Sequence, residues 1–379
     1  MSLFQIDAGR EWRGGQRQSL YLARELKAKG YSFHFVVQPE SPLHEKAAAE
    51  GLPVLPLEMK SELSFGAARR LAKMMKRERC VLAHFHDAHA VSVGGMACRR
   101  ANVPIRIISR RVDFPLKTNI FSKKKYTQDI DRIIAISDGV KDVLLKGGIA
   151  PGVIDVVPSG IDFSPFDAVT DRNFLRAEFG FAPDAFLAGI VAALEDHKGH
   201  RYLIEAARLI KARAPRAKII VVGKGSLQLE LDRQARDLQV DDLVYFLGFR
   251  EDVPRILASL DVFVLSSHLE GLGTSIMDAM ASRLPVVATA VGGIPEVVSD
   301  GETGLLVAPR SPEALADAIV RLYLDRPLAR RLGERGCEVV HEKFSAEAMA
   351  RRIIEIYERI AHKKGIKLRS EPGPGRSGR

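Results

Sequence analysis

The sequence predicts an α/β protein built from two doubly wound parallel-sheet domains of the Rossmann type. Its 379 residues suffice for two domains of ordinary size, and 46% of them are hydrophobic, so that each domain can bury a core. Short apolar runs alternate with longer amphipathic stretches, which is typical of strand–helix alternation in parallel sheets. The alternation stops near residue 162 and restarts near residue 186, which divides the chain in two.

The first domain is expected at residues 1–162, where apolar runs are interpreted as strands and amphipathic stretches as helices. The expected strands cover residues 3–6, 32–37, 53–57, 81–85, 105–108, 132–136 and 154–157. The expected helices cover residues 16–30, 42–50, 65–78, 88–101 and 138–147.

A linker region is expected at residues 163–185, because it contains Pro165, Gly180 and Pro183 and only one short helical pattern. The second domain follows at residues 186–344. Its expected strands cover residues 187–192, 217–222, 244–247, 262–265, 286–288 and 304–307. Its expected helices cover residues 200–213, 227–238, 253–258, 274–282, 294–299, 312–325 and 328–342.

One further helix is expected at residues 345–362, with apolar residues at helical spacing that include Met349, Ile353 and Tyr357. The basic tail at residues 363–379 contains the run P-G-P-G and is expected to be disordered.

The formal net charge of +10 favours an anionic partner. Basic residues gather at positions 69–79 and 99–125, which favours an anionic membrane surface or a phosphate-bearing substrate as much as ordinary solvated helix faces. Nucleic acid is not expected, because no recognition motif appears.

Cys80, Cys98 and Cys337 are scattered without metal-ligand spacing, which favours a reduced cytoplasmic protein. No apolar run approaches ~20 residues, and an apolar run begins at residue 3, so neither a membrane-spanning helix nor a signal peptide is expected. The expected location is the cytoplasm, with peripheral placement on the inner face of the cytoplasmic membrane.

The most specific stretch runs from residue 267 to residue 295. An apolar strand leads into Glu270, and a glycine-rich turn then opens a helix that carries Asp278 eight residues later. The turn consists of Gly271, Leu272, Gly273 and Thr274. Free N–H groups at a helix start suit a phosphate, and carboxylates on either side suit hydroxyl groups. The stretch therefore predicts a site for a nucleoside-diphosphate sugar.

Two further motifs follow strands of the second half. Lys198 stands beside Gly199 at a strand-to-helix turn, where an ammonium group can meet a diphosphate. Gly223 belongs to the run G-K-G, which lacks the third glycine of a dinucleotide fingerprint and is interpreted as a tight turn at the nucleotide-binding edge.

In the first half, Gly14 and Gly15 lie between a strand and a helix, where they allow a sugar or phosphate to approach the backbone. Arg110 and Arg111 follow another strand, and their guanidinium groups suit an acceptor or a phosphate.

His84 and His86 share one side of a strand. Two histidines leave a zinc site incomplete, so no metal is expected, and His86 is a candidate hydrogen-bonding group for the acceptor.

The whole pattern resembles family 4 glycosyltransferases of the GT-B fold over nearly the full length. The matching runs are G-G near the start, V-P-S-G-I-D-F, H-K-G-H-R-Y-L-I-E-A, the segment from Glu270 to Asp278, V-G-G-I-P-E and G-L-L-V-A-P. The resemblance implies two Rossmann-like domains facing a cleft, and a last helix that crosses back to the first domain. It also implies retaining transfer from a nucleotide sugar, without a required metal or other cofactor.

By the same resemblance, Lys198 holds the diphosphate and, with Glu270, forms the catalytic pair. Glu270 and nearby amides hold the donor sugar, and Asp278 binds the ribose. Three positions depart from the family pattern. Asp278 replaces a glutamate, Ala193 stands where an arginine is frequent, and Arg110-Arg111 occupy a loop that often carries a histidine.

The expected acceptor is a glycan, a lipid-linked sugar or a lipopolysaccharide-type molecule of the cell envelope. The sequence leaves open a nucleotide-sugar epimerase or a sugar phosphorylase on the same fold, and a non-catalytic GT-B subunit. An NAD enzyme has only the G-K-G run in its favour.

Overall fold

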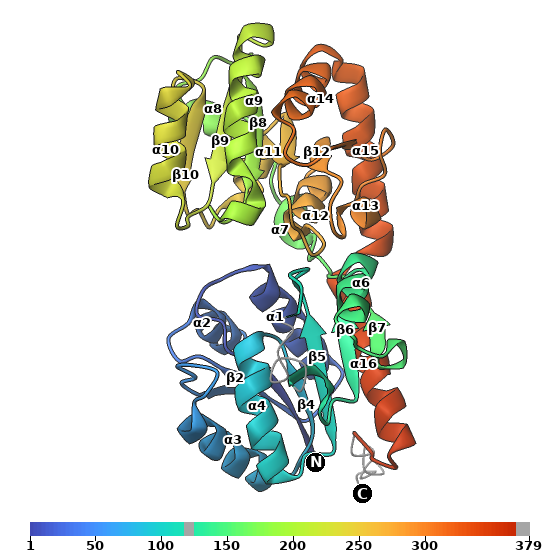
Figure 1. Cartoon of the computed structure of the whole chain (residues 1–379). Helices are drawn as coiled ribbons and strands as arrows, with labels where there is room; N and C mark the ends of the chain where they lie inside the picture. Colours follow the sequence, from blue (N-terminus) through green and yellow to red (C-terminus); the bar gives the residue numbers. More distant parts are fainter. Residues whose placement is uncertain (117–124, 369–379) are drawn as a thin grey trace, which may run out of the picture. The chain divides into compact units, whose positions relative to one another are not determined.

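The computed structural model describes residues 1–116 and 125–368, which form two compact units (Figure 1). Unit 1 contains Met1–Gly160 together with the chain from Ala346 onward, and unit 2 contains Ile161–Ser345. Part of the basic cluster, including Lys117 and Lys123, and the tail from residue 369 onward lie outside the described residues.

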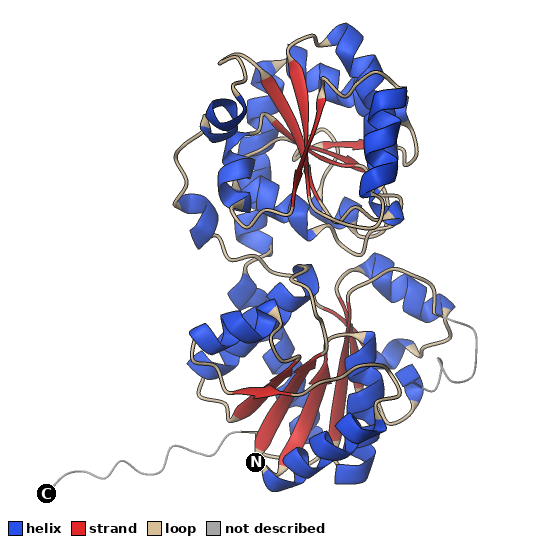
Figure 2. Cartoon of the chain, turned by 90° about the vertical axis from the view of Figure 1, so that its left-hand side faces the viewer, coloured by secondary structure: helices blue, strands red, loops and turns tan. Residues whose placement is uncertain are grey.

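Unit 1 is built on a seven-stranded parallel sheet in the order β3-β2-β1-β4-β5-β6-β7. The strands are β1 (Ser2–Asp7), β2 (Phe33–Val37), β3 (Val54–Pro56), β4 (Cys80–Phe85), β5 (Ile105–Arg110), β6 (Arg132–Ala135) and β7 (Ile154–Val156). The helices are α1 (Gly14–Ala28), α2 (Pro42–Ala49), α3 (Phe65–Arg77), α4 (Ala88–Ala101), α6 (Asp138–Lys146) and α16 (Ala346–Lys363). Helices cover both faces of the sheet (Figure 2).

Helix α16, the last of the described elements, completes the core of unit 1. It packs against α1 and buries Met349, Ile353, Tyr357 and Ile360 in the cluster that also holds Phe35 of the sheet. Burying each of the three aliphatic side chains Met349, Ile353 and Ile360 stabilises the unit by about 1.5–3 kcal/mol, so the helix is an integral part of unit 1.

Unit 2 is built on a six-stranded parallel sheet in the order β10-β9-β8-β11-β12-β13. The strands are β8 (Phe186–Val191), β9 (Ala217–Val222), β10 (Val244–Gly248), β11 (Val262–Leu265), β12 (Val286–Thr289) and β13 (Leu305–Val307). The α-helices are α7 (Ser164–Asp167), α8 (Phe174–Phe179), α9 (His200–Arg213), α10 (Gln228–Asp237), α11 (Val253–Ser259), α12 (Thr274–Ala281), α13 (Ile294–Val297), α14 (Pro312–Leu324) and α15 (Arg326–Lys343). The predicted α/β class with two parallel-sheet domains is confirmed.

The segment between the two sheets, residues 163–185, carries α7 and α8 and lies within unit 2. Helix α8 is fixed there by Arg176, which donates to the carboxylate of Asp261 at 2.7 Å and to two backbone carbonyls. Leu175 beside it is fully buried. The segment is therefore packed rather than extended.

Helix α1 begins at Gly14, two residues before the expected residue 16. The N–H of Arg17 donates to the carbonyl of Arg13 at 3.2 Å, so the glycine pair forms the first turn of the helix rather than a loop before it. Across the described residues, no helix has the length and apolar character needed to cross a membrane.

Candidate active site

The strand order of each sheet reverses direction at one point, between β1 and β4 in unit 1 and between β8 and β11 in unit 2. In open parallel sheets, ligands bind past the carboxyl ends of the strands at such a switch point. Lys198 follows β8 and Glu270 follows β11. Unit 2 therefore places both predicted catalytic residues at its switch point.

Lys198 and Glu270 form an ion pair with 2.5 Å between Nζ and Oε2. Their side chains are 20% and 12% exposed, so the pair is shielded but open to a ligand. The hydroxyl of Ser267 donates to the same Oε2 atom at 3.3 Å. The carboxylate and the ammonium group, which the sequence predicted as separate site residues, thus form one ion pair.

The backbone brings these two side chains together. The N–H of His268 donates to the carbonyl of His197 at 2.9 Å, and the hydroxyl of Ser266 donates to the carbonyl of Lys198 at 3.2 Å. Gly199 has φ +68°, and a Cβ atom there would lie 2.1 Å from the carbonyl oxygen of Ser266. Only glycine permits this close approach of the loop after β8 to the loop after β11.

The glycine-rich turn leads directly into α12. The helix has no side-chain cap and no acidic residue in its first turn. Its first N–H groups have no partner within the helix, which makes this end attractive to an anion. Leu272 within the turn is 1% exposed, so its side chain belongs to the core and only its backbone can face a ligand.

Asp278 and Gly223 have different surroundings. Asp278 lies on α12 and is 6% exposed, a buried carboxylate within the helix that begins at the turn. Gly223 has φ +145°, and a Cβ atom there would lie 1.9 Å from the carbonyl oxygen of Ala192. The G-K-G run is thus a tight turn required by close packing on the loop after β8.

In unit 1, Gly14 and Gly15 form the first turn of α1, and Arg111 lies against them. A Cβ atom on Gly15 would lie 3.6 Å from Cδ of Arg111, an ordinary van der Waals contact. Burial lowers the pKa of Arg111 to about 10, against the opposing pull of Asp7 and Tyr357. The guanidinium group therefore keeps its charge at neutral pH.

Arg110 has a different environment from its neighbour. Its Nη2 atom donates to the carbonyl of Phe114 at 2.5 Å, and its Nη1 atom donates to the hydroxyl of Tyr126 at 3.1 Å. The guanidinium carbon also lies 5.6 Å from the centre of the Tyr126 ring. These bonds hold the Arg110 side chain against Phe114 and Tyr126. Arg111 instead lies against Gly15, so the two arginines do not share one set of contacts.

His86 is buried in a hydrogen-bonded network of unit 1. Its Nε2 atom lies 2.5 Å from Oε1 of Gln5, and Nε2 of Gln5 donates to the hydroxyl of Tyr357 at 2.8 Å. That hydroxyl lies 2.5 Å from Nδ1 of His84, whose ring is 4.2 Å from the ring of His86. Burial, followed by the nearby His84 and Arg111, lowers the pKa of His86 well below its usual value, so the ring is neutral.

Two family models match the chain. The model described as "Glycosyl transferases group 1" matches residues 171–339, and the one described as "Glycosyltransferase Family 4" matches residues 12–164. The D-inositol 3-phosphate glycosyltransferase of Actinosynnema mirum is 31% identical over 297 residues, which cover 75% of this chain and 68% of that protein. The chain belongs to glycosyltransferase family 4.

A second relative of this glycosyltransferase matches a larger share of the chain. The UDP-Gal:alpha-D-GlcNAc-diphosphoundecaprenol alpha-1,3-galactosyltransferase of Escherichia coli is 26% identical over 336 residues, or 83% of this chain and 86% of that protein. For the first curated relatives, the match spans from 49% to 86% of their own lengths.

The solved structure of Anabaena HepE in complex with UDP and glucose has the same fold. It superposes with a TM-score of 0.85 at 21% identity and covers 95% of this chain and 100% of that one. The predicted GT-B fold of this glycosyltransferase is confirmed.

Ser267 and His200, which lie near Lys198 and Glu270, were not predicted as site residues. Ser267 is fully buried, and its carbonyl accepts a bond of 2.5 Å from the hydroxyl of Thr289, also fully buried. This bond fixes the backbone from which Ser267 reaches Glu270. Small hydroxyl residues carry no periodic signal, so the sequence alone does not reveal them.

His200, the first residue of α9, was likewise not predicted. Among the described residues, neither of its buried ring nitrogens has a hydrogen-bond partner. Burial, with smaller contributions from Lys198 and His197, lowers its pKa to about 3. The His200 ring is therefore neutral, and it lies at the start of α9, directly after the loop that carries Lys198.

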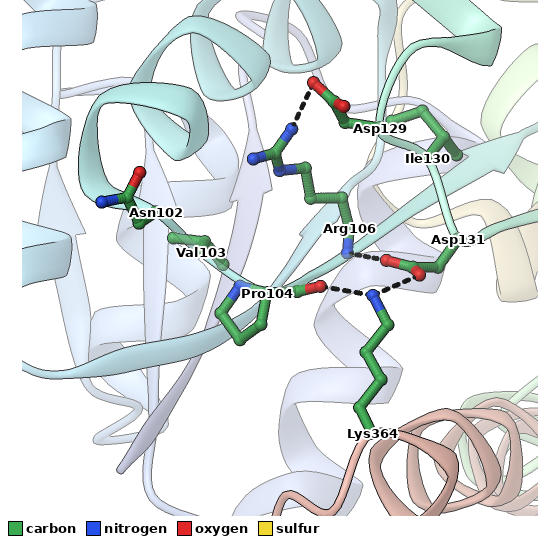
Figure 3. Close-up of a pocket in the computed structure, with 8 residues that line it drawn as sticks. All are labelled: Asn102, Val103, Pro104, Arg106, Asp129, Ile130, Asp131 and Lys364. Carbon is green, nitrogen blue, oxygen red and sulfur yellow. Dashed lines mark hydrogen bonds and ion pairs between the residues drawn. The ribbon is translucent and has the colours of Figure 1, made fainter.

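A polar cavity of about 380 Å³ lies at the other edge of the unit 1 sheet, near the amino ends of β5 and β6 (Figure 3). Lys364 there donates to the carbonyl of Pro104 at 2.6 Å and pairs with Asp131 at 2.5 Å. Arg106 pairs with Asp129 at 2.9 Å. These contacts attach the chain after α16 to the sheet. The cavity therefore lies where α16 joins the sheet, away from the carboxyl ends of the strands.

Proposed function

We propose that this glycosyltransferase moves a sugar from a nucleoside-diphosphate sugar to an acceptor hydroxyl with retention of configuration. The observation that carries the proposal is the shielded Lys198–Glu270 pair at the switch point of unit 2, beside the uncapped start of α12. The Glu270 carboxylate suits the hydroxyl groups of a sugar. The Lys198 ammonium group and the first N–H groups of α12 suit a diphosphate.

Binding exchanges partners within this pair. A diphosphate attracts the ammonium group of Lys198 and the first N–H groups of α12. Glu270 is then released to accept hydrogen bonds from hydroxyls of the donor sugar. Ser267 keeps one carboxylate oxygen in place during the exchange, because its hydroxyl donates to Oε2 at 3.3 Å.

The reaction breaks the bond between the sugar C1 atom and the phosphate oxygen, and it forms a bond from C1 to the acceptor oxygen on the same face. The acceptor proton moves to the leaving phosphate oxygen, so no side chain has to act as a strong base. Fixed positive groups at the developing phosphate charge are the main source of rate acceleration. Lys198 and α12 supply these groups, and we propose that no metal is required.

The other predicted donor residues keep assigned roles within this proposal. Asp278 binds the ribose, and the turn at Gly223 borders the nucleotide. Gly14 and Gly15 contribute backbone N–H groups of α1, and His86 is an acceptor-side candidate.

We propose an acceptor of the cell envelope, either a glycan, a lipid-linked sugar or a lipopolysaccharide-type molecule. The Escherichia coli relative, whose name specifies a diphosphoundecaprenol-linked acceptor, supports this assignment. So does the surface of α3, where Arg69, Arg70 and Lys73 are exposed and the preceding Leu63 and Phe65 are 70% and 68% exposed. Cations beside exposed apolar side chains suit an anionic membrane surface, on the inner face of the cytoplasmic membrane.

The test supplies the purified chain with nucleotide sugars in the presence of a chelator and follows release of the nucleoside diphosphate. Turnover should persist with the chelator, and NMR of the product should show the anomeric configuration of the donor. Inversion, or turnover without any acceptor or water consumed, would contradict the proposal. Sedimentation with anionic and neutral vesicles tests the membrane contact separately.

A further inference from the structure

The loop that carries Glu270 is held from two neighbouring strands of the unit 2 sheet. This loop follows β11, and β11 lies between β8 and β12. On the β8 side, the hydroxyl of Ser266 donates to the carbonyl of Lys198 at 3.2 Å, so this contact depends on the loop that carries the lysine. The contacts on the β12 side come from a different part of the chain.

Thr289, the last residue of β12, supplies the first contact on that side. It is fully buried, and its hydroxyl donates to the carbonyl of Ser267 at 2.5 Å and lies 3.4 Å from the carbonyl oxygen of Leu265. The hydroxyl of Ser267 in turn donates to Oε2 of Glu270 at 3.3 Å. The Thr289 hydroxyl therefore reaches the Glu270 carboxylate through a single intervening residue.

The second contact comes from the loop after β12. The N–H of Gly293 donates to the carbonyl of Glu270 at 3.2 Å. Thr289 anchors the start of this loop, because its carbonyl accepts from the N–H of Val291 at 2.9 Å. β12 is paired on both sides, with β11 and β13, and all four of its residues are fully buried. The β12 side is therefore a firm support for the backbone of Glu270.

The two sides respond differently to a ligand. Under the proposed function, a diphosphate attracts the ammonium group of Lys198, which now lies 2.5 Å from Oε2 of Glu270. The β12 contacts use a buried neutral hydroxyl and a backbone N–H, both already bonded, so a diphosphate does not compete for them. They therefore keep their geometry while the ion pair opens.

We propose that Thr289 is a positioning residue of this glycosyltransferase. It keeps the Glu270 carboxylate in place for the donor sugar once Lys198 has turned to the diphosphate. Thr289 acts through the backbone of Ser267 and touches no substrate. This role rests on the proposed function, in which Glu270 contacts the sugar.

Thr289→Val removes the hydroxyl, keeps the β-branched shape and leaves a buried carbonyl without this donor. Release of nucleoside diphosphate should show kcat lowered roughly 5- to 50-fold, the range that follows from losing a buried hydrogen bond. KM for the nucleotide sugar should change less than about 2-fold, because Lys198 and α12 still hold the diphosphate. Thr289→Ser restores the hydroxyl and should recover most of the loss.

Thr303→Val is the matched control. Thr303 is almost fully buried, and its hydroxyl accepts from the N–H of Ser299 at 2.8 Å, so this substitution also breaks one bond in the interior of unit 2. Thr303 precedes β13 and thus lies at the amino ends of the parallel strands, opposite Thr289. Both variants should be less stable in urea, but only Thr289→Val should lose kcat. Equal kcat in the two variants would overturn the proposal.

A Glu270→Ala background separates positioning from a general loss of packing. In this background, Thr289→Val should lower the remaining kcat by less than about 2-fold, because the side chain that it positions is absent. The same fold-loss with and without the Glu270 side chain would assign Thr289 a purely structural role and contradict the proposal.

The ion pair gives a second readout that needs no turnover. A double-mutant cycle of Lys198→Met and Glu270→Gln, followed by urea denaturation, measures the coupling between the two side chains. This coupling should shrink in Thr289→Val and stay unchanged in Thr303→Val, and an unchanged coupling in Thr289→Val would overturn the proposal. Absence of nucleotide-sugar turnover in the parent chain would instead refute the proposed function, and the coupling would still report on Thr289.

Discussion

The carboxyl edges of the two sheets hold their charged groups in different ways. In unit 2 the cation and the acid are paired across 2.5 Å, and they are brought together by loops that follow neighbouring strands. In unit 1, Gln5, His84 and His86 form a buried hydrogen-bonded network that is joined to α16 through the hydroxyl of Tyr357. The comparison shows that the same edge of a parallel sheet carries an ion pair in unit 2 and a buried hydrogen-bonded network in unit 1.

The largest effect should come from breaking the pair in unit 2. Lys198→Met or Glu270→Gln should each lower kcat/KM at least ~100-fold, the scale seen when one charge-stabilising group is removed. The double variant should lose little more, because the two groups act as a unit. Steady-state release of nucleoside diphosphate measures the effect.

Arg201→Met is the control for this cycle. Arg201 pairs with Asp196 at 2.5 Å in the same region, but the two side chains are 36% and 62% exposed, and exposed pairs contribute little. A comparable loss in Arg201→Met, or near-normal turnover in Glu270→Gln, would remove the distinction between the pair and its surroundings.

The next effect concerns the network of unit 1. Tyr357→Phe removes a hydroxyl that contacts Gln5 and His84, and it leaves both without that partner in the core. The free energy of unfolding should fall by about 1–3 kcal/mol, the cost of an unsatisfied buried group. Urea denaturation measures it.

Tyr31→Phe is the matched substitution for Tyr357→Phe. Tyr31 also donates to a residue of α16, the carboxylate of Glu358, but that bond is only partly buried. Its loss should cost less. Equal losses of unfolding free energy in the two variants would show that the buried network stabilises unit 1 no more than the partly buried bond of Tyr31 does.

Acidification should weaken unit 2 through His200. Its pKa falls from the ordinary 6.5 to about 3 on folding, so the unfolded chain binds an extra proton between these values. Stability contributed by the neutral ring is present above about pH 6.5 and is lost as the pH falls, with a slope of up to about 1.4 kcal/mol per pH unit.

His200→Leu should flatten this part of the pH profile and change stability little at pH 7.5, because no hydrogen bond of the ring is lost among the described residues. Urea denaturation at pH 7.5 and pH 5 measures the difference. An unchanged profile would mean that other buried histidines, such as His84 and His86, dominate the acid response.

The smallest effect should come from Ser267→Ala. It removes one bond of 3.3 Å to Glu270, which corresponds to about 0.5–1.5 kcal/mol, or roughly 2- to 12-fold in rate. The loss should appear in kcat more than in KM, and Ser267→Thr should restore it. A change confined to thermal stability would assign Ser267 a purely structural role.

The fold class followed from periodicity, because alternating strands and helices leave a strong pattern, and the structure confirms it. The meeting of Lys198 and Glu270 could be predicted because each lies in a loop that follows a strand, and the carboxyl ends of parallel strands share one edge. The first turn of α1 was misplaced, because two glycines resemble a loop more than a helix start.

Other features depend on contacts that a linear pattern does not contain. Tyr357 was interpreted as one apolar position of an amphipathic helix, yet its hydroxyl meets Gln5, which is 352 residues away in sequence. Arg110 and Arg111 looked equivalent as neighbours, and only the surrounding acceptors distinguish them. The catalytic, donor and acceptor roles of the predicted residues stay predictions until the variants above are measured.

The return of α16 to unit 1 also affects how the protein is made. Unit 2 is one continuous segment, Ile161–Ser345, so all of it leaves the ribosome before Ala346 does. Unit 1 emerges first but lacks α16, which packs against α1 in the cluster that holds Phe35, until all of unit 2 has been synthesised. We therefore expect unit 2 to fold before unit 1 is complete. Until α16 is made, the apolar face that it covers stays exposed, and a chaperone should be needed most at this stage.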